Sequence, residues 1–181
     1  MMSTWLIFTI IFGGMMSFSI GANDAANGLA TSYGSGAASL WKILALGAVA
    51  EFIGAMFCAN QVASTLGNEI VEMGGVTDEQ KQIMMFSVSL ASWIFIMTSS
   101  FSGMPISGTH SVVGALLGAG IVTTNVHDLN WTKLGWIVFY WVVSPLTSAT
   151  IAFILMIYVS WLTLDTQRFK YWNRLLYLQM I

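Results

Sequence analysis

The sequence contains little charge. Lys, Arg, Asp and Glu together make up 8% of its 181 residues, whereas soluble domains contain about 25%. Hydrophobic residues make up 56% of the chain, and the mean hydropathy is +0.76. The continuous apolar runs are too long for the alternating strands of a membrane β-barrel. We therefore expect an all-α integral membrane protein.

Cysteine and clustered reactive groups are also scarce. The single Cys58 excludes an internal disulfide, and the net charge of −2 argues against a nucleic-acid partner. The sequence has no His/Cys cluster, no nucleophile beside a base and no P-loop, so we expect neither an enzyme nor a bound cofactor. No basic residue precedes the first apolar segment, which predicts a membrane helix rather than a cleaved signal peptide.

The apolar residues fall into five segments, at about residues 4–21, 39–60, 83–101, 110–125 and 134–162. A straight span needs about 20 residues. The polar stretch GANDAAN (21–27) interrupts the first segment and the fourth is short, which predicts a polytopic helical bundle with a broken first helix. The third and fourth segments are either two spans or a re-entrant hairpin around SSFSGMPISGTHS (99–111). In both cases they start and finish on the same side.

The positions of Lys and Arg predict the orientation of the chain. Four lie near segment ends on one side and two on the other, namely Lys42, Arg168, Lys170 and Arg174 against Lys81 and Lys133. The positive-inside rule then places the N-terminus outside and the C-terminus inside. We expect residues 1–162 to form the membrane domain. The basic, aromatic tail, 163–181, resembles an interfacial helix.

Three groups of polar residues fall at membrane depth, and the first is Asn23, Asp24 and Asn27. On a helix their i,i+3 and i,i+4 spacing places the side-chain oxygens on one face. An ionised aspartate costs about 2.5–3.5 kcal/mol at a helix centre and generally marks a functional site. Carboxylate and amide oxygens suit a hard cation such as Na⁺. The alternative is a polar contact between helices.

The second group is Glu51, which has apolar neighbours for a full turn on both sides. An acidic residue in this position is a candidate functional group. It either binds a cation, carries a proton, or is a neutral buried acid held by one hydrogen bond.

The third group lies in GMPISGTHS (103–111), where Pro105 and the glycines break the helix. The hydroxyls of Ser107, Thr109 and Ser111 then lie where the next helix begins, and a helix start attracts anions. Thr109 or Ser111 is alternatively a simple N-cap. His110 is either a direct ligand or a hydrogen-bonded spacer.

The charge balance predicts the mechanism. All six Lys and Arg residues lie at segment ends, in loops or in the tail, whereas the acidic Asp24 and Glu51 are expected at membrane depth. Two like charges 4 Å apart repel by about 4 kcal/mol at an effective dielectric near 20. An anion can therefore bind here only with co-bound cations or protons, which predicts ion-coupled symport.

GANDAANGLATSYGSGA, the AEFIGA around Glu51 and GMPISGTHSVVGALLGAG together resemble the N-terminal half of the PiT family of inorganic phosphate transporters, over about residues 4–162. The resemblance implies Na⁺- or H⁺-coupled uptake of phosphate, or of a related oxyanion such as sulfate. It implies Na⁺ binding around Asn23, Asp24 and Asn27, with Glu51 needed for transport. It also implies phosphate binding near the last group of residues, Ser107, Thr109, His110 and Ser111.

The family has two inverted repeats, whereas this sequence has one copy of each motif. A site at a repeat interface needs both halves. A second chain supplies the other repeat, an antiparallel copy of this chain does so, or the chain is a non-transporting structural subunit of a larger membrane complex. We favour one half of a cation-coupled phosphate symporter.

Overall fold

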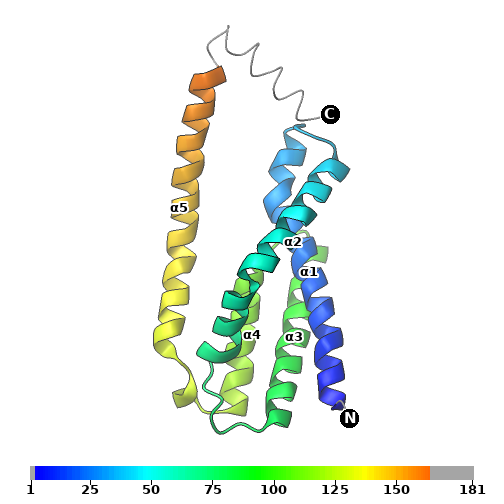
Figure 1. The fold of residues 1–181 in the computed structure, drawn as a ribbon, viewed down its shortest axis with the longest axis vertical. Helices are drawn as coiled ribbons and strands as arrows, with labels where there is room; N and C mark the ends of the chain where they lie inside the picture. Colours follow the sequence, from blue (N-terminus) through cyan, green and yellow to red (C-terminus); the bar gives the residue numbers. More distant parts are fainter. Residues whose placement is uncertain (1–2, 164–181) are drawn as a thin grey trace. The chain divides into compact units, whose positions relative to one another are not determined.

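The computed structural model describes residues 3–163. The long helices in chain order are α1 (Thr4–Gly34), α2 (Leu40–Ser64), α3 (Asp78–Phe101), α4 (Gly108–Thr123) and α5 (Trp131–Thr163) (Figure 1). A π-helical turn, η1 (Thr65–Glu69), extends α2, and a 3-10 turn, η2 (Val126–Asp128), precedes α5. Among the described residues, α1, α2, α3 and α5 are long and apolar enough to cross a membrane. The predicted all-helical membrane fold is confirmed. The predicted interfacial helix falls on residues 164–181, which lie outside the described part.

The predicted break in the first helix is wrong. α1 continues through GANDAAN without interruption for 31 residues, which is about 46 Å at 1.5 Å per residue. The polar stretch contains no proline, and a helix satisfies its own backbone hydrogen bonds where water is absent. That requirement outweighs the weak helix propensity of Asn and Gly.

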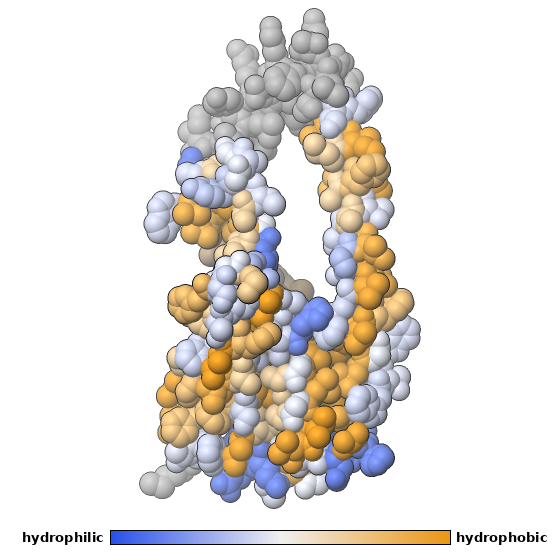
Figure 2. Space-filling model, turned by 180° about the vertical axis from the view of Figure 1, so that it is seen from behind, coloured by the Kyte–Doolittle hydropathy of each residue, from blue (hydrophilic) through white to orange (hydrophobic). Residues whose placement is uncertain are grey.

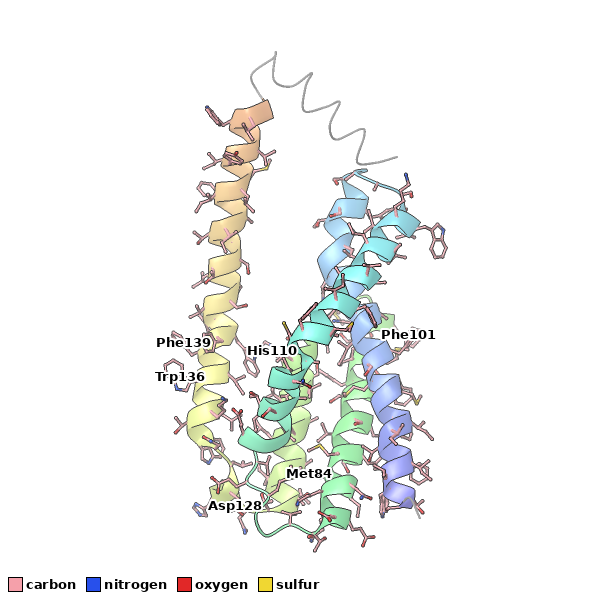
Figure 3. All side chains as sticks on the ribbon, viewed as in Figure 1. Met84, Phe101, His110, Asp128, Trp136 and Phe139 are labelled. Carbon is pink, nitrogen blue, oxygen red and sulfur yellow. The ribbon has the colours of Figure 1, made fainter. Side chains whose placement is uncertain are left out.

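The helices form two separate units, residues 1–131 and residues 132–181. In the first unit α1 and α3 run parallel, and α4 runs antiparallel to both (Figure 1). In the second unit α5 continues through Pro145. On α5 the ring of Trp136 contacts Phe139 and Tyr140, with centroids 5.7 and 6.2 Å apart (Figure 3).

Aromatic rings hold α3 against the first half of α1. Phe86 contacts Trp5, Phe8 and Phe12, with ring centroids 5.8, 5.9 and 5.3 Å away. Thr9 also donates a hydrogen bond to the carbonyl of Gln82, with an O···O distance of 3.2 Å. These contacts fix the level of α3 along α1, and so the level of the turn that follows α3.

α3 and α4 form a helical hairpin whose base is closed by two loop residues. Val71, before α3, and Leu129, after α4, form an antiparallel bridge, and both are buried. The bridge fits closely over Gly120 of α4, because a Cβ there would lie 2.9 Å from Val71 Cγ2 and 3.2 Å from Leu129 Cδ2. Both ends of the hairpin therefore lie at the end of the unit where α1 begins (Figure 1).

The distribution of hydrophobic and hydrophilic residues on the surface fits a bundle of membrane helices. Figure 2 shows hydrophobic residues over most of the helices and hydrophilic residues gathered at the end where the α2–α3 and α4–α5 connections lie. Most of the large exposed side chains of α2 and α5 are apolar, including Phe52, Phe57, Phe153 and Trp161. Such faces suit lipid or other membrane helices rather than water.

We expect Gly120→Ala to lower the stability of the first unit. The added methyl group would overlap Val71, which is 1% exposed, and overpacking of this kind costs about 1–3 kcal/mol. Gly118→Ala is the matched control, because no atom lies within 4 Å of its added Cβ and alanine favours helix by about 1 kcal/mol. Thermal unfolding of the purified chain in detergent measures both. Equal midpoints would show that the bridge does not pack on α4 in this way.

Candidate functional site

The turn between α3 and α4 is built from standard helix-ending and helix-starting elements. The N–H groups of Gly103 and Met104 donate to the carbonyls of Ser100 and Ser99, 3.1 Å away in both cases. This is a Schellman motif, and Gly103 has the positive φ of 69° that the motif requires. Pro105 follows and prevents the helix from continuing.

Ser107 is the N-cap of α4, rather than Thr109 or Ser111. Its side chain accepts a hydrogen bond from the backbone N–H of His110, with an N···O distance of 3.3 Å. The hydroxyl of Ser111 donates back to the carbonyl of Ser107 at 2.9 Å. The predicted alternative cap is therefore one turn too late, because the helix begins at Gly108.

The turn is joined to the middle of α1 through Asn23. Ile106 lies between Pro105 and the cap, so neither its N–H nor its carbonyl belongs to a helix. The Ile106 N–H donates to Asn23 Oδ1 at 3.1 Å, and Asn23 Nδ2 donates to the Ile106 carbonyl at 2.5 Å. Asn23 is 1% exposed. One amide side chain thus satisfies both backbone groups of Ile106, which water would not reach within a membrane.

Asp24 and Asn27 lie beside this contact. Asn23 Nδ2 also donates to Asp24 Oδ1 at 3.2 Å, and Asn27 Nδ2 donates to the Ile106 carbonyl at 3.3 Å. The predicted convergence of Asn23 and Asn27 on one helical face is therefore seen. Asp24 is half-buried and Asn27 is exposed, so both can still reach a ligand. A direct Asn23–cation contact stays a prediction, because its observed partners are protein atoms.

The start of α4 borders an open pocket of about 350 Å³, lined by Phe95, Ile106, Ser107, His110 and Ser111. His110 Nδ1 lies 2.6 Å from the Ser107 hydroxyl. Figure 3 shows His110 and Phe101 on either side of the turn, far from Asp128 at the other end of the hairpin. Three of the four predicted oxyanion residues therefore share one pocket. The fourth, Thr109, is exposed on the same helical turn.

Glu51 is exposed on α2, and its level can be inferred from the contact between α1 and α2. Leu29 Cδ1 would lie 2.7 Å from a Cβ added to Gly47. The two helices run in opposite directions (Figure 1) with the same rise per residue. Asp24, five residues before Leu29, is therefore nearly level with Glu51, four residues after Gly47. Counted from this contact, the backbones of Asp24 and Glu51 lie at about the same level on neighbouring helices, and no hydrogen bond joins the two side chains among those observed.

The sequence analysis missed three contributors. Ile106 acts through its backbone, Phe95 lines the pocket, and Ser99 donates its hydroxyl to the carbonyl of Met104. Ile106 could have been found, because a residue between a helix-ending Pro-Gly pattern and an N-cap has two backbone groups that need partners. Phe95 and Ser99 carry no such signal.

The chain is similar to known proteins over most of its length. The model of a family described as "Phosphate transporter family" matches residues 20–180. Relatives named "Putative phosphate permease" include one from Pyrococcus abyssi, 33% identical over 84% of this chain and 38% of the relative. Another, from Helicobacter pylori, is 38% identical over 84% of this chain and 29% of the relative.

A solved structure described as "The sodium-dependent phosphate transporter" is similar to this chain with a TM-score of 0.83 and 34% sequence identity. The similarity covers 91% of this chain and 41% of that one. This chain thus spans about two fifths or less of the length of these proteins.

We expect Asn23→Ala to destabilise the first unit by about 1–3 kcal/mol, the cost of leaving the Ile106 N–H unpaired, because the Ile106 carbonyl keeps its bond from Asn27. Asn27→Ala is the control, since the Ile106 carbonyl keeps its bond from Asn23. Thermal unfolding in detergent, followed by tryptophan fluorescence, compares them. An Asn23→Ala variant as stable as Asn27→Ala would show that Ile106 finds other partners.

Proposed function

Because this chain belongs to the phosphate transporter family, we propose that it forms one repeat of a cation-coupled symporter of inorganic phosphate. The second repeat lies outside this sequence, since the chain spans 41% of the solved relative and less of the others. The observation that carries the proposal is the direct link, through Asn23, between the carboxylate of Asp24 and the turn that begins α4.

The cation site is proposed at the oxygens of Asp24 and Asn27, with Glu51 at the same depth on α2. A carboxylate and an amide carbonyl are the ligand types of hard cations. The description of the solved relative as sodium-dependent supports Na⁺ as the cation. Asn23 contributes by holding the Asp24 carboxylate, and its own oxygen faces Ile106.

The oxyanion site is proposed at the start of α4. The unpaired N–H groups of a first helical turn carry a partial positive charge that favours anions. Ser107, Thr109, His110 and Ser111 add hydroxyl and imidazole groups on that turn, and three of them line the pocket. A tetrahedral oxyanion with several acceptor oxygens fits such a set of donors.

The order of binding follows from charge. The Lys residues of the described helices, Lys42, Lys81 and Lys133, all lie in the first turns of their helices, whereas Asp24 lies in the middle of α1. An oxyanion near a bare Asp24 is repelled by several kcal/mol, so the cation binds first and the oxyanion second. The loaded site then opens to the other side of the membrane. We propose that the N-terminus lies outside, as the distribution of Lys and Arg predicts.

We expect Asp24→Asn to abolish sodium-dependent phosphate uptake while the protein still inserts, because the variant lacks the charge that binds the cation. Uptake of labelled phosphate into native-membrane vesicles, with sodium or choline as the cation, measures this. Asp78→Asn is the control, since Asp78 is exposed in the first turn of α3 and pairs with Lys81 at 3.5 Å. Unchanged sodium-dependent uptake by Asp24→Asn would overturn the proposed cation site.

We expect Ser107→Ala to raise the phosphate KM by roughly 10- to 150-fold, the equivalent of one hydrogen bond to a charged group at about 1.5–3 kcal/mol. Ser102→Ala is the control, because the Ser102 hydroxyl donates to the Thr98 carbonyl in the preceding turn. The same vesicles, assayed over a range of phosphate with sulfate as competitor, give the KM and the preference between the two oxyanions. A KM that changes equally in both variants would argue against a ligand role for Ser107.

A further inference from the structure

The amide of Asn23 lies between the two proposed sites and is engaged at both of its polar atoms. Oδ1 accepts from the Ile106 N–H, and the two hydrogens of Nδ2 point to the Ile106 carbonyl and to Asp24 Oδ1. Ile106 directly precedes the N-cap Ser107. A movement of the Asp24 carboxylate is therefore transmitted through one side chain to the residue that sets the start of α4.

We infer that Asn23 is a positioning residue that couples cation binding at Asp24 to oxyanion binding at the start of α4. The inference rests on the proposed function, because it requires both sites. It assigns Asn23 a role that neither a cation ligand nor a packing residue would have.

The coupling has a physical basis in the two bonds of Asn23 Nδ2, which donates one hydrogen to Asp24 Oδ1 and the other to the Ile106 carbonyl. A bare Asp24 carboxylate pulls the amide toward itself, since bonds to ionised acceptors are stronger than bonds to neutral ones. A cation on Asp24 satisfies that carboxylate, so the amide holds Ile106 more firmly. The first turn of α4 is then fixed in the position that the oxyanion needs. By linkage, the oxyanion raises the affinity for the cation by the same factor.

Asn27 provides the matched control. It lies one turn from Asn23 on the same face and donates to the same carbonyl at 3.3 Å. Among the observed hydrogen bonds of this region, the Ile106 N–H donates to Asn23 and not to Asn27. Asn27 is also exposed, whereas Asn23 is buried. Loss of Asn27 should change cation affinity and leave the link between the two sites intact.

The first measurement needs no transport. Cys58 is the one cysteine of the chain, so Cys58→Ser with Met104→Cys places a single thiol in the turn, where Met104 is 67% exposed. The rate of its modification by a polar thiol reagent is compared in sodium and in choline, in native-membrane vesicles. We expect sodium to change the rate of modification several-fold in the Cys58→Ser, Met104→Cys protein. We expect the same change when Asn27→Ala is added, provided that sodium is saturating. With Asn23→Ala the rate should not depend on sodium.

The second measurement is the phosphate KM at low and at saturating sodium. Coupling free energies of typical size correspond to factors of about 5–150, and we expect a sodium-dependent change in KM of this order in the unmodified protein. Asn23→Ala should bring the factor to about 1. If that variant folds poorly, Asn23→Asp serves instead, since it keeps the acceptor for the Ile106 N–H and removes the donor to its carbonyl.

The outcomes separate the inference from the proposed function. A purely structural Asn23 would lower stability and leave the sodium dependence of labelling and of KM unchanged, which would overturn the inference alone. An absence of any sodium effect in the unmodified protein would overturn the cation coupling itself, and the role of Asn23 with it. Loss of sodium dependence in Asn23→Ala, with its retention in Asn27→Ala, supports both.

Discussion

The two hydrogen bonds between the Asn23 side chain and the Ile106 backbone hold the α3–α4 turn against the middle of α1. They give a turn without helical partners the two bonds that water would otherwise supply. Asn23 is 19 residues after the start of α1 and 11 before its end, so the turn lies about 29 Å from one end and 16 Å from the other.

Charge explains why this contact lies next to Asp24. The contact itself uses neutral groups, which a membrane interior tolerates when they are paired. The carboxylate beside it has no cationic side chain among its observed hydrogen-bond and ion-pair partners. The neutral link and the uncompensated charge therefore occupy one face of α1, with the start of α4 opposite. A cation that neutralises the Asp24 carboxylate therefore changes the electrostatic environment of the turn directly.

The sequence predicted the fold class, the five helical segments and the residues around the turn, because long apolar runs and Gly-Pro-Ser patterns have strong local causes. It failed at GANDAAN, where polar residues suggested a break and the helix continued. It also identified Asn23 as one oxygen in a cation site, which stays a prediction, but gave no sign that Asn23 pairs with a backbone segment 83 residues away. Pairings of this kind depend on the level at which α3 packs against α1, which Phe86 and its three aromatic neighbours set and no local motif records.

The close packing at Gly120 has a geometrical consequence for α4. The helix is clamped under Val71 and Leu129 near its C-terminal end, while the opposite end is tied to α1 by side-chain amides. Any tilt of α4 therefore pivots near Gly120, and the displacement grows along its 16 residues. Over the 12 residues from Gly120 back to Gly108, about 18 Å, a rotation of about 5° carries the first turn by about 1.6 Å. Small angular changes at the clamped end thus become ångström-scale changes around Ser107, while Gly120 hardly moves.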